Sequence, residues 1–97
     1  MIQIASPQIG KEEREAVDRV LRSGIIAQGP EVAKFEKEFA KYCGTKYAIG
    51  TGNGLDSLIL ILRAYKELGI LKSGDEVIVP SNTFIASILA ISENKLI

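Results

Sequence analysis

A glycine-rich turn, Gly50-Thr51-Gly52-Asn53-Gly54, is the part of this sequence best suited to chemistry. Glycine lets a backbone turn sharply and approach an oxyanion without a Cβ in the way. The turn precedes a helical pattern, and the first turn of a helix offers unpaired N–H groups and a favourable dipole to an anion. These features favour phosphate binding, but a turn that serves only geometry explains the pattern equally well.

The spacing of this turn excludes two familiar nucleotide-binding motifs. A dinucleotide fingerprint G-x-G-x-x-G needs glycine where Leu55 stands, and a Walker motif needs Gly-Lys-Ser/Thr where Leu55-Asp56-Ser57 stand. Asp56 is an awkward neighbour for a phosphate, because a carboxylate in the first turn suits the helix dipole but repels another anion. We therefore expect Asp56 either to take part in the helix cap or to contact another ligand group.

A second candidate is Pro80-Ser81-Asn82-Thr83-Phe84, which follows the short β-inclined run 76–79. Ligands collect at the carboxyl ends of strands in open α/β sheets. Phe84 could stack on a planar ring at such a position. Residue type alone, however, favours a buried core phenylalanine.

Other reactive side chains are scarce. With no histidine and only one cysteine, Cys43, the sequence offers no Cys/His metal set, no Cys-His nucleophilic pair and no internal disulfide. We therefore predict no metal site and assign no catalytic residue. Cys43 ends a helical pattern and is expected to be a packed thiol. A lone cysteine suits a reducing, cytoplasmic compartment.

The charges balance, with twelve basic and twelve acidic residues. They also alternate, as in Lys11-Glu12-Glu13-Arg14-Glu15, so we interpret the carboxylates of the first two helical patterns as solvated faces and assign them no chemistry. Nucleic acid and anionic membrane surfaces find no basic patch to bind. No apolar run approaches the span of a bilayer, and the start lacks a signal-peptide pattern, which also favours a cytoplasmic location.

Two helices are predicted in the first half of the chain. The first covers residues 11–22 and ends at Ser23-Gly24. The second begins at Pro30, ends at Gly44, and carries an apolar stripe that is the candidate core face. That stripe consists of Val32, Phe35, Phe39 and Tyr42.

The second half predicts strand, helix, strand, helix, an order typical of a mostly parallel α/β sheet. The strands are 46–50 and 76–79. The helix from Leu55 to near Gly69 is apolar nearly all round and is expected to be buried on two sides. The last helix is expected from about Thr83 to Asn94, with Ser81 or Asn82 as its cap.

These elements divide the chain into a helical segment, 1–45, and the start of an α/β domain, 46–97. A parallel sheet of only two strands leaves the apolar central helix without enough surface to pack on. We therefore expect the 97 residues to be a truncated piece of a larger domain.

Taken in order, the motifs of the chain resemble the start of the DegT/StrS-type sugar aminotransferases. The resemblance runs through nearly the whole sequence and rests on the order and spacing of several short motifs. These are Ser23-Gly24, Gln28-Gly29-Pro30, Phe35-Glu36, Gly52-Asn53-Gly54-Leu55-Asp56-Ser57-Leu58, Gly74-Asp75-Glu76-Val77-Ile78-Val79-Pro80 and Thr83-Phe84-Ile85-Ala86.

The resemblance implies the large pyridoxal 5′-phosphate (PLP) binding domain of the aspartate-aminotransferase fold. It places the cofactor phosphate loop at Asn53, Gly54, Leu55 and Asp56, with the N–H groups of Leu55 and Asp56 as donors. Many relatives have threonine at the position of Leu55, so this chain lacks one hydroxyl donor there. Phe84 matches the aromatic residue that stacks on the pyridine ring, which reverses the expectation from residue type.

The resemblance also implies an activity and marks what is missing. The full enzyme would transfer an amino group from glutamate to a keto group of a nucleotide-linked sugar, as a homodimer. The Schiff-base lysine, the aspartate on the pyridinium nitrogen and a phosphate-binding serine match no residue here, so the chain alone is expected to be inactive. The alternatives are a PLP-dependent sugar dehydratase of the same family, a non-catalytic self-association module, and a phosphate- or nucleotide-binding domain.

Overall fold

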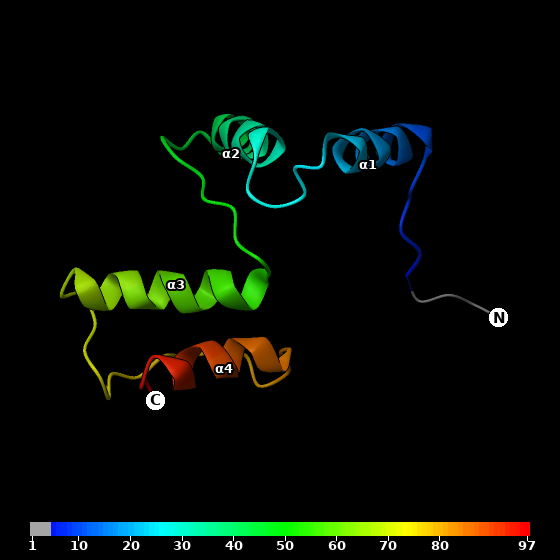
Figure 1. Cartoon of the computed structure of the whole chain (residues 1–97). Helices are drawn as coiled ribbons and strands as arrows, with labels where there is room; N and C mark the ends of the chain where they lie inside the picture. The colour runs from blue at the N-terminus through cyan, green and yellow to red at the C-terminus, as the bar shows by residue number, and fades with distance from the viewer. Residues whose placement is uncertain (1–4) are drawn as a thin grey trace. The chain divides into compact units, whose positions relative to one another are not determined.

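The computed structural model describes residues 5–97, and four helices form within that range (Figure 1). The chain divides into two compact units, Met1–Gly50 and Thr51–Ile97. The helices α1 and α2 lie in the first unit, and α3 and α4 lie in the second. The unit boundary therefore lies five residues after the boundary expected from the sequence.

Helix α1 spans Lys11–Ser23, and both of its ends are fixed by local contacts. At the start, the Gly10 N–H donates to Glu13 Oε2 at 2.7 Å. At the end, Gly24 adopts a left-handed conformation with φ of 72°, which glycine accepts without strain. The predicted helix and its end at Ser23-Gly24 are confirmed.

Helix α2 spans Pro30–Cys43, as the sequence predicted. Pro30 occupies the first turn, where its missing N–H costs nothing, and Gly44 ends the helix with φ of 69°. The expectation of a packed Cys43 thiol is wrong, because this last helical residue is exposed.

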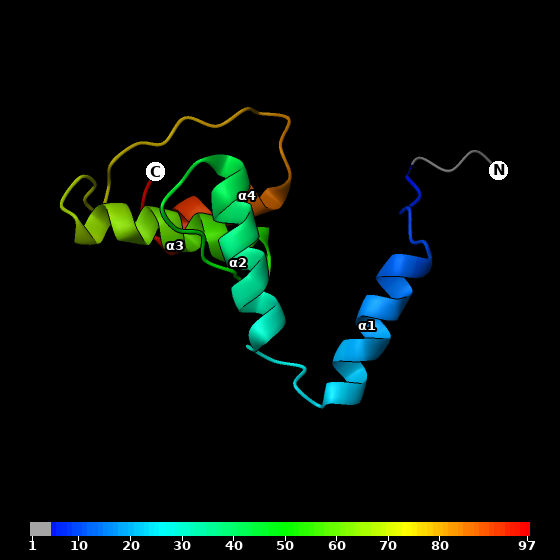
Figure 2. The same ribbon diagram turned by 90° about the horizontal axis from the view of Figure 1, so that it is seen from above.

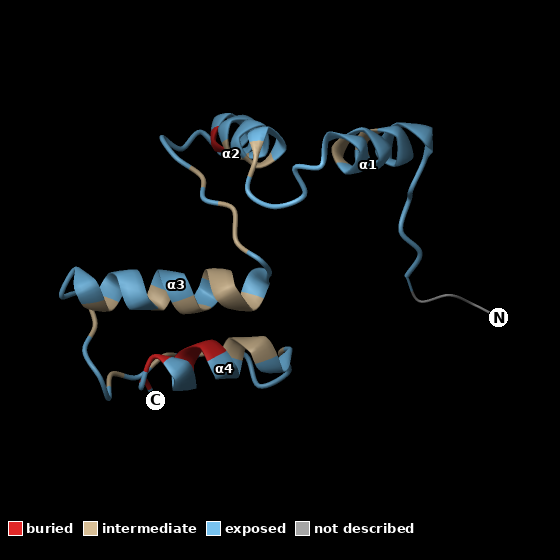
Figure 3. Cartoon of the chain, in the orientation of Figure 1, coloured by how far each residue is buried: buried red, intermediate tan, exposed pale blue. Residues whose placement is uncertain are grey.

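The covered face of α2 differs from the predicted stripe. Ala40 is buried, and Val32 and Glu36 are half-buried (Figure 3). These three residues follow one another at intervals of one helical turn. The aromatic residues of the predicted stripe, Phe35, Phe39 and Tyr42, are exposed. The segment 45–50 folds back along this covered face. Its two ends are tied to α2, with the Thr45 N–H bonded to Ala40 O at 3.0 Å and the Gly50 N–H bonded to Glu36 Oε1 at 2.7 Å.

No strand forms within residues 5–97, so the predicted strands at 46–50 and 76–79 have no regular secondary structure here. A strand exists through hydrogen bonds to a neighbouring strand, and the segment 46–50 contacts α2 instead. The second segment makes hydrogen bonds of the kind that join neighbouring strands. The Val77 N–H donates to Ile97 O at 2.7 Å and the Ile97 N–H donates to Asp75 O at 2.9 Å, which is the pattern of a parallel pair.

In the second unit, α3 spans Gly54–Glu67 and α4 spans Ile85–Glu93. The two helices pack side by side and begin at the same end, as both views show (Figures 1 and 2). α4 starts later than predicted, and the expected caps Ser81 and Asn82 are wrong. Phe84 occupies the cap position without a side-chain bond, and the Thr83 hydroxyl pairs with the Ser87 hydroxyl at 3.0 Å.

Helix α3 is less covered than its composition led us to expect. It contains no buried residue, and large apolar side chains such as Leu60 and Ile61 are about half exposed. The reason is that α4 is the element packed against it within this unit. No helix in residues 5–97 has both the length and the apolar character needed to cross a membrane.

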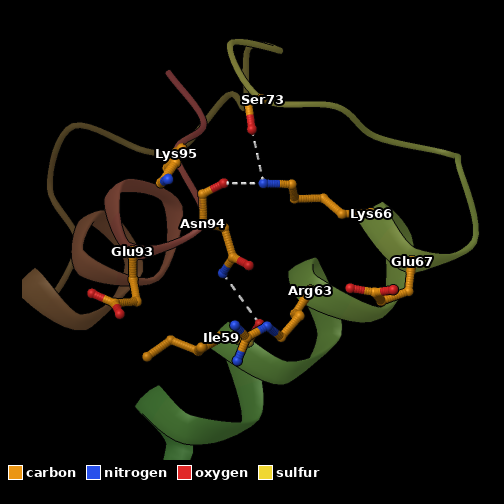
Figure 4. Close-up of a pocket in the computed structure, with 8 residues that line it drawn as sticks. All are labelled: Ile59, Arg63, Lys66, Glu67, Ser73, Glu93, Asn94 and Lys95. Carbon is orange, nitrogen blue, oxygen red and sulfur yellow. Dashed lines mark hydrogen bonds between the residues drawn. The ribbon is translucent and has the colours of Figure 1, made fainter.

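Asn94 joins α3 to α4. It is the buried polar residue of the described chain, and its side-chain amide donates to Ile59 O in α3 at 3.2 Å and to Ala90 O in α4 at 2.9 Å (Figure 4). Its own carbonyl accepts from Lys66 Nζ at 2.7 Å. A buried amide that satisfies carbonyls on two helices fixes how they pack.

We predict that Asn94→Ala lowers the free energy of unfolding of the second unit by about 2 kcal/mol, because it leaves a buried carbonyl without its donor. Urea titration followed by circular dichroism measures the change. Asn82→Ala is the matched control, since Asn82 is exposed. Equal effects of the two substitutions would show that Asn94 does not join the helices.

Candidate functional site

The glycine-rich turn leads directly into α3, and Asn53 is the residue that caps this helix. Its backbone is extended, with φ of −164° and ψ of 175°, and its Oδ1 accepts the Asp56 N–H at 3.0 Å. An asparagine cap satisfies one of the N–H groups that the first turn leaves without partners. The helix begins at Gly54 because Asn53 caps it.

The Asp56 carboxylate takes part in the same cap, which is the first of the two roles expected for it from the sequence. Asn53 Nδ2 donates to Asp56 Oδ2 at 3.0 Å, so the asparagine amide contacts both the backbone and the side chain of Asp56. The carboxylate also lies against the turn, since a Cβ at Gly52 would be 3.0 Å from Asp56 Oδ2. Glycine at position 52 leaves room for this arrangement.

Two hydroxyl groups brace the turn from within. Thr51 Oγ1 lies 2.6 Å from Ser57 Oγ, and both hydroxyls reach the Asn53 carbonyl, at 3.1 Å and 3.2 Å. Thr51 and Ser57 are therefore linked across the start of α3.

The donors left for an anion are the N–H groups of Gly54 and Leu55. Both lie in the first turn, where the helix itself supplies no acceptor, and the Asp56 N–H is already bound by Asn53. Space is open at Gly54, where an added Cβ would meet no atom within 4 Å. Paired backbone donors at the positive end of a 14-residue helix suit a phosphate group.

Phe84 lies at the cap of α4, and its side chain is 79% exposed. The alternative in which Phe84 is a core residue therefore does not hold for the described chain. Because α3 and α4 begin at the same end of the unit, Phe84 and the turn before α3 lie toward that end (Figures 1 and 2). No group of three or more metal-binding side chains occurs in residues 5–97.

Sequence reasoning missed the hydroxyls of Thr51 and Ser57 at the turn, and it missed the contact of Glu36 with the Gly50 N–H in the first unit. The two hydroxyls could have been found from their position six residues apart across a helix start. Glu36 was grouped with the solvated carboxylates. The overlooked signal is its spacing, since Val32, Glu36 and Ala40 follow one another at four-residue intervals on one helix face.

The pocket in Figure 4 lies between α3 and the end of α4, and two of its polar residues, Lys66 and Asn94, make structural contacts. Lys66 Nζ is bound to Ser73 Oγ at 3.0 Å and to the Asn94 carbonyl at 2.7 Å, and the Asn94 amide points to Ile59. These contacts occupy the Lys66 amine and the Asn94 amide. We therefore keep the turn before α3 as the candidate site.

Residues 7–96 match the model of the DegT/DnrJ/EryC1/StrS aminotransferase family. The chain belongs to this family. The match includes the turn before α3 and Phe84, so both candidate segments lie inside the matched range.

Two characterised relatives of the DegT family are sugar transaminases. The dTDP-3-amino-3,6-dideoxy-alpha-D-galactopyranose transaminase of Aneurinibacillus thermoaerophilus is 62% identical over 84 residues, which are 87% of this chain and 22% of that protein. The dTDP-3-amino-3,4,6-trideoxy-alpha-D-glucose transaminase of Streptomyces venezuelae is 50% identical over 91 residues, 94% of this chain and 23% of that protein. The chain thus spans less than a quarter of these relatives' length.

A solved structure in the DegT family shows the same fold. It is a GDP-4-keto-6-deoxymannose-3-dehydratase with a trapped PLP-glutamate geminal diamine, and it matches with a TM-score of 0.86 and 30% identity over 97% of this chain and 25% of its own. The described helices are therefore consistent with the fold of PLP-dependent enzymes of the DegT family, of which this chain spans about a quarter.

We predict that Asn53→Ala destabilises the second unit by about 1 kcal/mol, because it removes the acceptor of the Asp56 N–H. Asn53→Ser is the control, since a serine hydroxyl can cap the same N–H and should restore most of the loss. Urea titration of both variants provides the measurement. An Asn53→Ala variant as stable as the parent would mean that the cap does not hold the turn.

Proposed function

We propose that this chain forms the N-terminal part of a PLP-dependent aminotransferase that acts on a keto group of a nucleotide-linked sugar, with glutamate as the amino donor. The observation that carries the proposal is the turn 51–56, whose free N–H groups at the start of α3 lie in a segment 62% identical to a named sugar transaminase. The trapped PLP-glutamate species in the related dehydratase supports glutamate as the second substrate.

The residues present suit a phosphate-bearing cofactor. We assign the phosphate to the N–H groups of Gly54 and Leu55, with the Asp56 N–H retained by Asn53. Leu55 contributes its backbone alone, since its side chain has no hydroxyl. Phe84, exposed at the cap of the neighbouring helix, is the proposed stacking partner of the pyridine ring. PLP, when bound, supplies the electron sink that transamination requires.

The parallel sheet belongs to the same proposal. The hydrogen bonds of Ile97 with Asp75 and Val77 have the geometry expected where a strand at 76–79 meets a following parallel strand. Exposure along this segment also alternates, with Val77 and Val79 half-buried and Ile78 fully exposed. We propose that 46–50 and 76–79 are strands in a protein of the relatives' length.

The 97 residues alone are proposed to be inactive. The described part of the chain orients a phosphate and an aromatic ring, but no residue in it is assigned to proton transfer or to covalent attachment of the cofactor. A dehydratase of the same family is the alternative, supported by the solved structure at 30% identity. The transaminase is favoured because its named relatives are 62% and 50% identical.

We further propose that the full-length protein, meaning a chain of the relatives' length that contains this segment, is a cytoplasmic homodimer. Exposed aromatic side chains on α2 support self-association, with Phe35 and Phe39 stacked at 5.5 Å on the surface. A single cysteine is consistent with a reducing compartment. A non-catalytic self-association module rests on the same surface, and it would bind no PLP.

The full-length protein incubated with PLP, glutamate and a nucleotide-linked 3-keto-6-deoxyhexose should yield the amino sugar and 2-oxoglutarate. A parallel incubation with a nucleotide-linked 4-keto-6-deoxyhexose tests the alternative, because mass spectrometry of the sugar nucleotide would then detect the 3-deoxy product of a 3-dehydratase. Omission of glutamate is the control and should abolish product. Formation of neither product, with no PLP bound, would overturn the proposal.

We predict that Gly54→Pro weakens PLP binding by the full-length protein roughly tenfold relative to Gly54→Ala, because one hydrogen bond to a charged group is lost. Proline is accepted at the first helical position and deletes the N–H, whereas alanine keeps it and fits the open space at Gly54. The extended Asn53 backbone is compatible with a following proline. Equal dissociation constants in a PLP absorbance titration would exclude Gly54 as a phosphate donor.

A further inference from the structure

The Asn53 carbonyl is the group on which the contacts of the turn converge. It accepts the Ser57 N–H at 3.2 Å, which is the first hydrogen bond of α3. Thr51 Oγ1 and Ser57 Oγ also reach it, at 3.1 Å and 3.2 Å, and the two hydroxyls lie 2.6 Å apart. All of these groups belong to the second unit, so the arrangement is local to the start of α3.

The hydroxyl hydrogens decide which of these contacts form together. Each hydroxyl has one hydrogen to donate, so two hydrogens serve the three contacts among Thr51 Oγ1, Ser57 Oγ and the Asn53 carbonyl. One hydroxyl donates to the other, and the second then donates to the carbonyl. Either order supplies the carbonyl with a donor and uses both hydrogens. In this arrangement neither hydroxyl has a hydrogen left for a phosphate.

The Asn53 carbonyl and the Gly54 N–H belong to one peptide group. That group is planar and trans, so its C=O and N–H bonds point in opposite directions. A contact that fixes the carbonyl therefore also fixes the direction of the Gly54 N–H. This N–H is one of the two donors that the first turn of α3 leaves for an anion.

The turn needs such a restraint because of its glycines. Gly52 and Gly54 flank Asn53 and have no side chains to limit the backbone. A larger residue at position 52 would crowd the Asp56 carboxylate, since a Cβ there would lie 3.0 Å from Oδ2. The Thr51 side chain instead spans Gly52, from residue 51 to the carbonyl of residue 53.

We propose that Thr51 and Ser57 are positioning residues for the Gly54 N–H in the cofactor turn. Their hydroxyls hold the Asn53 carbonyl, and the shared peptide plane directs the N–H away from the body of α3, toward the phosphate. A donor already held in its binding orientation loses less entropy when the ligand binds. This inference rests on the proposed function, because it takes the PLP phosphate as the ligand of the turn.

Single and double variants of the full-length protein, compared by PLP absorbance titration, provide the first test. Thr51→Val and Ser57→Ala each leave one hydroxyl within reach of the Asn53 carbonyl, so each should leave the dissociation constant nearly unchanged. The double variant removes both donors and should raise the constant about fivefold, the equivalent of one net hydrogen bond. A double variant that binds PLP as tightly as the parent would overturn the proposal.

The second test asks whether the hydroxyls act through Gly54. Gly54→Ala keeps the N–H and Gly54→Pro deletes it, so the double variant is made in both backgrounds. We expect an effect of about fivefold beside Gly54→Ala and none beside Gly54→Pro, because the hydroxyls then have no N–H to orient. An equal effect in both backgrounds would mean that the hydroxyls only support the local fold, and it would overturn the proposal.

The two proposals fail in different ways. If the parent protein binds no PLP, the proposed function is wrong and this inference fails with it. If the parent binds PLP and the double variant matches it, the proposed function stands and the role of the hydroxyls is wrong. If the double variant does not fold, Thr51→Val combined with Ser57→Cys replaces it, because a thiol is a weak donor of similar size. An affinity equal to the parent's would again overturn the role.

Discussion

The first turn of α3 is the constraint on which the candidate site depends. A helix leaves its first N–H groups without internal partners, and here Asn53 caps the N–H of Asp56 alone. The groups of Gly54 and Leu55 remain for an anion, and the helix dipole favours one. The bond from Asn53 to the Asp56 carboxylate also explains how an acidic residue could be accommodated beside the proposed phosphate site, because the carboxylate is held within the cap.

Polar contacts to the backbone, more than a large core, hold this turn in place. The buried apolar residues of the described chain are few and mostly lie on α4 and after it, with Ala40 in α2 as the exception. The turn is instead held by the hydroxyls of Thr51 and Ser57 and by the Asn53 cap. Such contacts are directional, so they fix the orientation of N–H groups in a way that apolar packing does not. Orientation is what a phosphate site requires.

Local signals in the sequence predicted the helices well, because caps act within a few residues. Gly24 and Gly44 end their helices in the left-handed conformation, and Pro30 begins the second one. The strands could not be confirmed in the same way, since a strand needs hydrogen bonds to a distant partner, and the pairing near Ile97 is the one parallel contact seen in the described chain. The contact of Glu36 with the Gly50 N–H could not be predicted from charge alternation, because that pattern gives the charge of a side chain but not the backbone group that it contacts.

A crystal structure of the full-length protein with PLP tests most directly whether the first turn of α3 holds the cofactor phosphate. We expect phosphate oxygens within about 3 Å of the backbone nitrogens of Gly54 and Leu55, while Asn53 still accepts from Asp56. The Phe84 ring should lie against the pyridine ring. A phosphate bound away from α3, with both of these N–H groups facing water, would contradict the assignment of the site.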